Sequence, residues 1–301
     1  REAMAMPERP ERLIVVGAGA IGVEFAYLYA TFGTEVTLVE MLDRILPIED
    51  EEISKELARS FKKRGIAMHT GTKVASLVRD GDVVRTELSG PKGTEKIEAD
   101  AALVAIGVQG NVEGLGLEEA GVHHEKGRIQ VDGRFRTNVD RVLAIGDVIG
   151  PPLLAHVAAA EGVAAVEGLA GKERPEVDYK KIPGCTYCQP QVASIGLTER
   201  EAREQGYEIK VGKFPLRASG KAVAAGETEG FAKVIVSAPY GEIIGVHMIG
   251  AEATEVIAEA GLALTAEATA ETIIDTVHAH PTVAEAIQEA TAAALGEAIN
   301  I

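Results

Sequence analysis

Residues 12–22 read Arg-Leu-Ile-Val-Val-Gly-Ala-Gly-Ala-Ile-Gly, and the fold class follows from this stretch. The apolar, β-branched run at 12–16 predicts a strand, and it leads into a Gly-x-Gly-x-x-Gly motif. Residues 20–32 predict a helix, and the run at 35–39 predicts a second strand. Strand, helix and strand in this order form a βαβ unit, so the sequence predicts an α/β fold.

The glycine motif and the residue after the second strand predict a dinucleotide site. Gly17 permits a tight turn, Gly19 lets a pyrophosphate approach the backbone, and Gly22 lets helix and strand pack closely. Ile21 belongs to the same turn and is a candidate cofactor contact. Glu40 can accept hydrogen bonds from a ribose and repel a 2′-phosphate, which favours NAD over NADP. The alternative is a plain glycine-rich turn with a solvated glutamate.

A second stretch predicts another nucleotide-like ligand. The apolar run at 142–145 predicts a strand that ends in Gly146-Asp147, where a carboxylate reaches the ligand-binding edge of an α/β sheet. A helix is expected to start at Ala155, so that amides of Leu154 to His156 face an anionic or electron-rich group. The alternative is that Gly-Asp is an ordinary turn.

The stretch His-Ala-His-Pro-Thr-Val-Ala-Glu at 278–285 predicts an acid-base pair. Pro281 can occupy the first position of the last helix, which places His280 at its entry and Glu285 close enough to pair. A carboxylate beside an imidazole fixes its tautomer and produces a base suited to a thiol. The alternative is a histidine that is merely packed or solvated near a helix start.

The two cysteines, Cys185 and Cys188, form a Cys-x-x-Cys that runs into a strand rather than a helix N-terminus. The spacing is too solitary for a four-ligand zinc site, so we expect neither a redox role nor a metal. Two cysteines cannot make a disulfide framework, which is typical of a reducing compartment and favours a cytoplasmic protein. No apolar run reaches the length that spans a bilayer.

The charge balance excludes several partners. With 46 acidic and 30 basic residues the formal charge is −16, which argues against nucleic acids and anionic membranes. No lysine or arginine follows Lys233, whereas ten acidic residues do: Glu242, Glu252, Glu255, Glu259, Glu267, Glu271, Asp275, Glu285, Glu289 and Glu297. Most of them are explained by solvated helix faces. The sharper hypothesis is that they steer a basic protein partner to this region.

The remaining pattern divides the chain into three expected domains, 1–107, 108–180 and 181–301, with a linker at 172–183. The last domain has strands followed by helices, which predicts an α+β arrangement. Further elements are expected as follows: a helix near 50–64, strands at 73–79, 83–88 and 101–106 with a turn at Gly81-Asp82, strands at 192–195, 231–236 and 243–249, and helices near 251–264 and 283–295.

These motifs, in this order, resemble the flavoprotein disulfide reductases of the pyridine nucleotide-disulfide oxidoreductase family, and most closely its dihydrolipoyl dehydrogenase branch. The resemblance rests on the stretches 17–22, 137–147 with 154–156, 190–199 and 278–285. It implies a Rossmann-like NAD-binding domain, a partial FAD-binding segment and a C-terminal α+β dimerisation domain. It also implies FAD and NAD as cofactors.

The resemblance assigns roles to individual residues. Asp147 would hold the flavin ribityl chain, and the amides of Leu154, Ala155 and His156 would face the flavin. His280 would deprotonate a dihydrolipoyl thiol of the neighbouring subunit, with Glu285 as its partner. Three further positions carry over: Glu24 would pair with a lysine near the flavin, and Gly107 and Val74 would adjoin NAD.

The implied activity is NAD-dependent reoxidation of protein-bound dihydrolipoyl groups through FAD and a redox disulfide. The implied partners are a second copy of the chain and the lipoyl-bearing acyltransferase of a 2-oxo acid dehydrogenase complex. The family's first glycine motif and its Cys-x-x-x-x-Cys precede the region matched here, so we expect a C-terminal fragment that does not turn over alone. The alternatives are a non-catalytic dimerisation and docking module, another NAD(P)H-dependent disulfide reductase, and a flavin-free NAD dehydrogenase.

Overall fold

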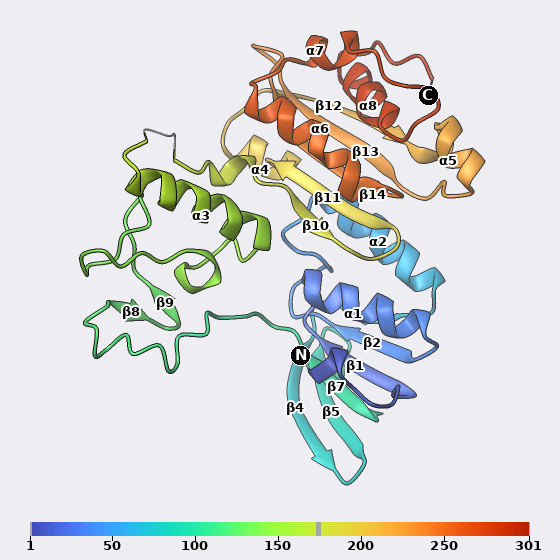
Figure 1. Ribbon diagram of the computed structural model, residues 1–301. Helices are drawn as coiled ribbons and strands as arrows, with labels where there is room; N and C mark the ends of the chain where they lie inside the picture. The colour runs from blue at the N-terminus through green and yellow to red at the C-terminus, as the bar shows by residue number, and fades with distance from the viewer. Residues whose placement is uncertain (1, 173–175, 301) are drawn as a thin grey trace. The chain divides into compact units, whose positions relative to one another are not determined.

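The computed structural model describes residues 2–172 and 176–300, and the chain packs as two units (Figure 1). The first unit comprises residues 1–106 and 183–301, and the second comprises residues 107–182. The expected linker at 172–183 lies partly outside the described residues, and a short 3-10 helix, η3 (Tyr179–Lys181), follows that gap. The division into three domains stays a prediction.

The glycine motif lies on a four-stranded parallel sheet in the order β3-β2-β1-β7. The predicted strands and helices of this part are confirmed, and only the three-residue β3 was not expected. The elements are β1 (Arg12–Val16), α1 (Ala20–Thr31), β2 (Glu35–Val39), α2 (Glu51–Lys63), β3 (Ala67–His69) and β7 (Ala101–Val104). Asp50 caps α2 by accepting from the Glu52 N–H at 3.0 Å. The βαβ unit therefore forms as its apolar pattern dictates.

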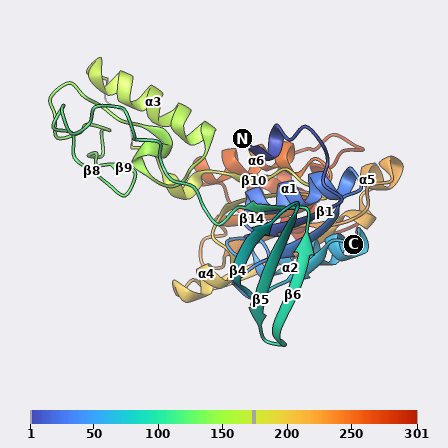
Figure 2. The same cartoon turned by 90° about the horizontal axis from the view of Figure 1, so that it is seen from below.

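A three-stranded antiparallel sheet extends from the same unit (Figure 2). It consists of β4 (Lys73–Asp80), β5 (Val83–Gly90) and β6 (Gly93–Ala99). The turn at Gly81-Asp82 is confirmed, whereas β6 was missed because its sequence is mostly polar and its residues are largely exposed. Leu88 and Ala99 are buried together with Ile14 of the parallel sheet, so the two sheets share a small core.

The C-terminal part of the first unit is a five-stranded antiparallel sheet in the order β10-β11-β14-β13-β12. Its strands are β10 (Gly184–Thr186), β11 (Gln191–Gly196), β12 (Ile209–Pro215), β13 (Phe231–Ser237) and β14 (Ile243–Gly250). Its helices are α4 (Glu199–Glu204), α5 (Gly220–Ala225), α6 (Ala253–Thr265), α7 (Ala270–Asp275) and α8 (Glu285–Leu295). This is the α+β arrangement that the sequence predicted.

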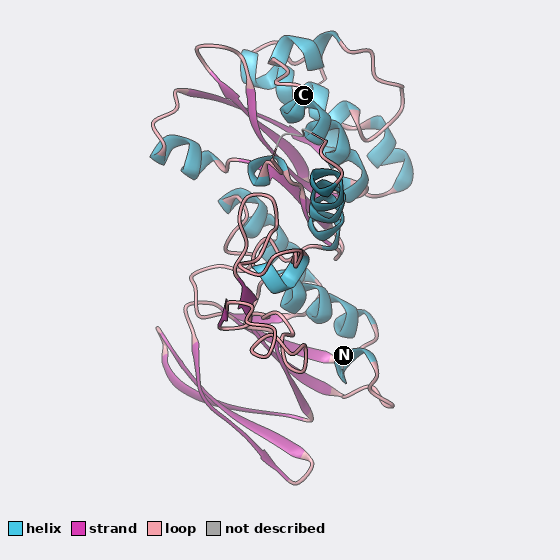
Figure 3. Cartoon of the chain, turned by 60° about the vertical axis from the view of Figure 1, so that its left-hand side comes forward, coloured by secondary structure: helices cyan, strands magenta, loops and turns pink. Residues whose placement is uncertain are grey.

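Helices α6 and α8 cover one face of this sheet, and α2 packs against β14 (Figure 1). Figure 3 shows these layers by colour, with helices in cyan beside strands in magenta. Every residue of β14 except Ile244 is buried, which explains why this strand is almost continuously apolar. Val192 and Ile249 share a core with Leu57 and Phe61 of α2. The parallel and antiparallel sheets are thus joined by a common hydrophobic core.

The second unit is largely loop, with β8 (His124–Glu125), β9 (Arg128–Ile129), the 3-10 helix η2 (Gly146–Ile149) and α3 (Ala155–Leu169). The expected strand at 142–145 is wrong. Among the described residues only Leu143 pairs, in an isolated bridge with Arg136. The run bonds to residues 135–137 through only two backbone hydrogen bonds, from the Thr137 N–H to the Val142 carbonyl and from the Ala144 N–H to the Phe135 carbonyl, both at 3.0 Å, and this is too short a ladder for a strand. Gly146 and Asp147 therefore open a 3-10 turn.

The expected helix start at Pro281 is also wrong, because α8 begins at Glu285. The chain first turns through residues 279–284. Thr282 donates its hydroxyl to the Ala279 carbonyl at 2.8 Å and its N–H to Glu285 Oε2 at 2.8 Å. These contacts hold residues 279–282 in a turn ahead of the helix. Within the described residues no helix is long and apolar enough to cross a membrane.

Candidate functional site

The turn at 17–22 has the geometry that its three glycines predict. Gly17 has φ +98°, and a Cβ there would lie 2.4 Å from the Ala105 carbonyl oxygen. A Cβ on Gly22 would lie 1.8 Å from the Gly17 oxygen, whereas one on Gly19 would meet no atom within 4 Å. Gly17 and Gly22 are therefore required by packing, and Gly19 leaves open space beside the backbone.

Glu40 directly follows β2 and is oriented by the same turn. Its Oε2 accepts from the Ala18 N–H at 2.7 Å and its Oε1 from the Leu42 N–H at 2.9 Å. Each carboxylate oxygen keeps a further lone pair for a ligand hydroxyl. Gly19 is the N-cap of α1, and no described side chain caps this helix. Uncapped amides beside open space fit a pyrophosphate.

Three further predicted contacts lie in different surroundings. Ile21 is 43% exposed in the first turn of α1, beside the open space at Gly19. Val74 of β4 packs on the small core around Ile14 and Val39. Gly107 has φ +140° and is the first residue of the second unit.

In the second unit a buried carboxylate, Glu161, organises the turn at Gly146. Glu161 is 2% exposed, and it accepts from the Gly146 N–H at 2.7 Å and from the Tyr179 hydroxyl at 2.8 Å. Burial, together with this contact, raises the pKa of Tyr179 to about 12. Sequence reasoning missed both residues. The available signal was a glutamate, Glu161, within the apolar, alanine-rich run of α3.

Asp147 and the start of α3 remain accessible beside this turn. Asp147 is exposed, as are Ala155 and His156, and Leu154 is the N-cap. Among the described residues no side chain caps α3. The helix start therefore offers N–H donors, and the nearby carboxylate offers acceptors, which fits a ligand with hydroxyls and an electron-rich ring.

His280 and Glu285 form the predicted pair. Nδ1 of His280 lies 2.9 Å from Glu285 Oε1, and the His280 side chain is 76% exposed. Burial opposes ionisation of Glu285, but the Thr282 N–H and the His280 ring outweigh it, so the pKa of Glu285 lies below its usual value. An ionised carboxylate accepts, so Nδ1 carries the proton and Nε2 offers its lone pair.

A second histidine, His278, was not predicted to have a role. Its side chain is 6% exposed, and its Nε2 lies 2.7 Å from Glu259 Oε1 while its Nδ1 lies 2.9 Å from the Thr276 carbonyl oxygen. These contacts anchor the loop that carries His280 to α6. His278 is therefore buried and held by two contacts, whereas the side chain of His280, two residues later, is exposed to solvent.

Glu24 and the cysteines lie together where α1 meets the antiparallel sheet. Glu24 Oε1 accepts from the Tyr187 N–H at 2.8 Å. Burial raises the pKa of both thiols, that of Cys188 to about 12. The Cys188 thiol donates to the Pro190 carbonyl at 3.1 Å. Both thiols are held in the unreactive protonated form. Among the described residues, no group of three His, Cys, Asp or Glu is placed to hold a metal ion.

Comparison with known proteins matches two family models to the chain. Residues 1–162 match the pyridine nucleotide-disulphide oxidoreductase model, and residues 182–291 match the dimerisation domain of the same family. A dihydrolipoyl dehydrogenase of Zymomonas mobilis is 48% identical over 99% of this chain and 64% of its own length. The dihydrolipoyl dehydrogenase of Bacillus subtilis is 45% identical, also over 99% of this chain and 64% of its own length.

Solved structures agree. LpdA of Mycobacterium tuberculosis is 29% identical with a TM-score of 0.86, over 95% of this chain and 62% of its own. The HOCl-induced flavoprotein disulfide reductase RclA of Escherichia coli is 27% identical with a TM-score of 0.89, over 96% of this chain and 66% of its own. The chain thus spans about 64% of the length of the curated relatives, and the expectation of a missing N-terminal portion stays a prediction. By its sequence and its fold, the chain belongs to the pyridine nucleotide-disulphide oxidoreductase family.

Proposed function

We propose that this protein acts as a dihydrolipoyl dehydrogenase, an NAD-dependent oxidoreductase that reoxidises dihydrolipoyl groups. The observation that carries the proposal is the exposed His280–Glu285 pair, with 2.9 Å between Nδ1 and Oε1. Relatives with this printed name are 43 to 48% identical over almost the whole chain.

The pair suits proton removal from a thiol. Glu285 holds the Nδ1 proton, so the lone pair of Nε2 points away from the carboxylate and toward solvent. A free thiol has a pKa of about 8.5, so a base in contact with it is needed to form thiolate near neutral pH. The contact of Glu285 with the Thr282 N–H at 2.8 Å keeps the carboxylate, and through it the ring, in one orientation.

The two predicted cofactors would be held by separate parts of the chain. The amides of the turn at Gly19 and the Glu40 carboxylate would hold NAD, and Asp147 with the residues 154–156 would hold FAD. A 2′-phosphate would meet the Glu40 carboxylate, which supports NAD over NADP. Bound there, FAD would supply the two-electron transfer between a dithiol and the nicotinamide.

The proposed partners are a second copy of the chain and a lipoyl-bearing acyltransferase of a 2-oxo acid dehydrogenase complex. The match of residues 182–291 to a dimerisation domain supports the first. The 76% exposure of His280 supports it too, because a base that serves a neighbouring subunit must be accessible from outside its own chain. The cytoplasmic location stays a prediction.

The test is oxidation of free dihydrolipoamide, followed as NADH absorbance, by the FAD-loaded full-length holoenzyme, in which this chain is joined to the expected N-terminal portion that carries the family's redox cysteines. We expect His280→Gln to lower kcat about 10²- to 10⁴-fold, which is the usual contribution of a positioned base. His123→Gln, an exposed histidine of the second unit, is the matched control and keeps kcat. Unchanged turnover in His280→Gln contradicts the proposed role. Equal activity with NADP contradicts the role of Glu40.

A second candidate, a disulfide reductase with another substrate, is favoured by the higher TM-score of the RclA structure, 0.89 against 0.86. The same assay separates the two, since this candidate consumes NADH or NADPH with another disulfide and leaves dihydrolipoamide unoxidised. Purified protein without FAD that still forms a dimer would instead favour a docking module.

A further inference from the structure

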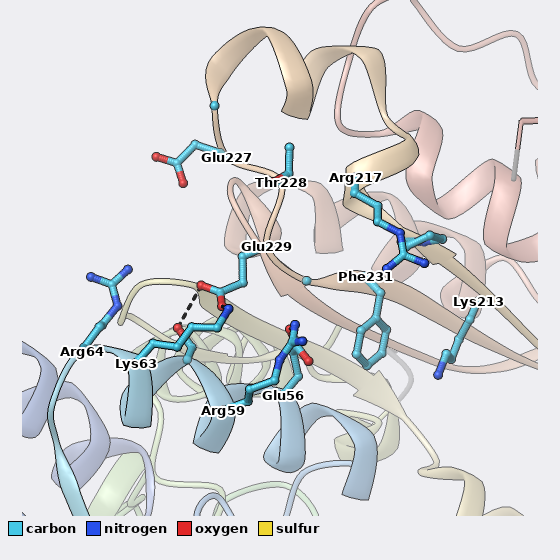
Figure 4. Close-up of a pocket in the computed structure, with 14 residues that line it drawn as sticks. Glu56, Arg59, Lys63, Arg64, Lys213, Arg217, Glu227, Thr228, Glu229 and Phe231 are labelled. Atoms are coloured by element: carbon cyan, nitrogen blue, oxygen red, sulfur yellow. Dashed lines mark hydrogen bonds and ion pairs between the residues drawn. The ribbon is translucent and has the colours of Figure 1, made fainter.

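A pocket of about 820 Å³ lies between the second half of α2 and the start of β13 (Figure 4). One wall is α2, with Arg59, Lys63 and the following Arg64. The opposite wall comes from the end of β12 with Lys213, from the 3-10 helix η4 (Leu216–Ala218), and from residues 226–231. Its volume is within the range of small-molecule sites, about 300 to 1,000 Å³.

The pocket is basic, although the chain carries a formal charge of −16. Five basic side chains line it against three carboxylates. Arg59, Lys63 and Lys213 are already in ion pairs, Lys213 with Glu52 at 2.6 Å, so the charge available to a ligand comes from Arg64 and Arg217. Glu229 accepts from Ser60 at 2.9 Å and from Lys63 at 3.0 Å. Burial opposes its ionisation, but these two contacts outweigh burial and hold the pKa of Glu229 below its usual value. Glu56 pairs with Arg59, and Glu227 accepts from Gln189 at 3.2 Å.

Two arginines keep their donors for a ligand. Within the described residues neither Arg217 nor Arg64 has an ion pair, and Arg64 lies over the Tyr27 ring at 5.6 Å. Figure 4 shows Arg217 reaching into the pocket toward Phe231, on the side opposite α2. A guanidinium presents a planar fork that matches phosphate oxygens, and a partner of opposite charge is missing there.

The loop at residues 226–231 lines the pocket, and its backbone position is set at Gly230. Gly230 has φ +108°, and a Cβ there would lie 1.9 Å from the Ile249 carbonyl oxygen, so the loop lies directly on β14. This close approach sets the position of Thr228, which lines the pocket. Phe231 is held under Lys213, whose Nζ lies 4.9 Å from the ring centroid. The pocket thus combines fixed donors with an aromatic wall.

We propose that this pocket binds a small phosphate-bearing metabolite, with Arg217 on the phosphate and Phe231 beside the organic part. It is separate from the dinucleotide turn. Helix α2 returns from the carboxyl ends of the parallel strands, where Gly19 and Glu40 lie, and the pocket lies along its second half. Thirteen residues of α-helix span about 20 Å, so the two phosphate positions are distinct.

The test is calorimetric titration of the purified full chain with inorganic pyrophosphate at low salt and saturating NAD, which keeps the dinucleotide turn occupied. We expect one pyrophosphate per chain, and we expect Arg217→Gln to weaken its binding about tenfold, the loss of one bidentate guanidinium. Arg134→Gln, an exposed arginine of the second unit, removes the same charge and is expected to leave the affinity within about twofold.

Several outcomes would overturn the proposal: no binding with NAD present, equal weakening by both substitutions, or tight binding that survives Arg217→Gln. Equal weakening would mean diffuse attraction by total charge alone. If Arg217→Gln unfolds, Arg217→Lys makes the same test, because it keeps the charge but loses the planar fork that binds phosphate. NAD affinity is expected to be unchanged in both pocket variants, so a failure of the proposed function is seen separately from a failure of this site.

Discussion

At Gly17, Gly19 and Gly22 three identical residues have different physical reasons to be glycine. A Cβ would lie 2.4 Å from backbone at Gly17 and 1.8 Å from backbone at Gly22, whereas Gly19 faces open space. Substitution therefore separates a folding role from a ligand role at this turn.

We predict that Gly22→Ala destabilises the protein by about 1 to 3 kcal/mol or more, the usual effect of overpacking. Gly19→Ala keeps the melting temperature and instead weakens NAD, because its methyl group occupies the space beside the amides. Thermal unfolding and NAD titration on both variants check this. A Gly19→Ala protein that binds NAD normally would remove the turn from the proposed site.

Glu49 shows a different effect at the residue scale, because burial works against its charge. It is 8% exposed, one of its carboxylate oxygens has no described hydrogen-bond partner, and burial raises its pKa although Ser194 donates to it. A folded-state pKa above the usual 4.5 means that the ionised form is less favourable in the folded chain.

We predict that Glu49→Gln gains stability relative to the parent as pH rises above about 4.5, since the parent loses stability while Glu49 ionises. Urea unfolding midpoints between pH 4 and pH 8 measure the difference. Glu51→Gln, whose side chain is 60% exposed two residues away, is the control and should show no such trend. A difference in unfolding midpoint between Glu49→Gln and the parent that stays constant with pH contradicts the prediction.

At the scale of elements, one lysine joins α2 and α4 to the antiparallel sheet. Lys233 of β13 is 1% exposed, and its Nζ lies 3.0 Å from Asp50, 2.9 Å from Glu52 and 2.8 Å from Glu199. Burial lowers the tendency of the amine to hold its proton, but the three carboxylates outweigh it and raise the pKa of Lys233 to about 12. The same contacts lower the pKa values of all three carboxylates.

We predict that Lys233→Met costs about 3 to 5 kcal/mol of stability, because it leaves buried carboxylates without their cation. The loss shrinks as pH falls below the usual carboxyl pKa values of 3.8 and 4.5, where protonation removes the unpaired charges. Chemical denaturation at pH 7 and pH 3.5 tests this. Lys210→Met, on the exposed side of β12, is the control. Equal effects of the two substitutions would contradict the inferred linkage.

At the scale of the whole molecule, charge is distributed unevenly. No lysine or arginine follows Lys233, so the charged side chains of α6, α7 and α8, which lie on the antiparallel sheet, are all acidic. Glu252 and Glu255 are exposed at the start of α6, and they belong to the segment that matches the dimerisation domain. Such a surface attracts basic partners over a distance set by ionic strength.

We predict that association with the proposed acyltransferase slows about tenfold or more when salt rises from about 50 to about 300 mM. Replacing Glu252 and Glu255 by Gln slows association at low salt, and replacing Glu118 and Glu119 of the second unit is the matched control. Stopped-flow measurements compare the association rates of the two double variants with that of the parent protein. An association rate that does not depend on salt would exclude steering by the acidic C-terminal region.

Local residue patterns were enough to predict the βαβ unit, the turn at Gly17 to Gly22, the pairing of His280 with Glu285 and the start of α3. These features depend on residues close along the chain, where periodicity, glycine geometry and short-range pairing act. The same patterns missed β6, whose polar residues carry no apolar signal, and they wrongly predicted a strand at 142–145.

The meeting of distant residues, in contrast, became visible only in the folded chain. Glu161 reaches back to Gly146, Lys233 meets Asp50 across 183 positions, and Arg217 faces α2 across a pocket. Burial and long-range contacts are set by the packing of whole elements, and no local pattern specifies them. The strand at 142–145 failed for the same reason, since pairing depends on a neighbour that tertiary packing supplies or withholds.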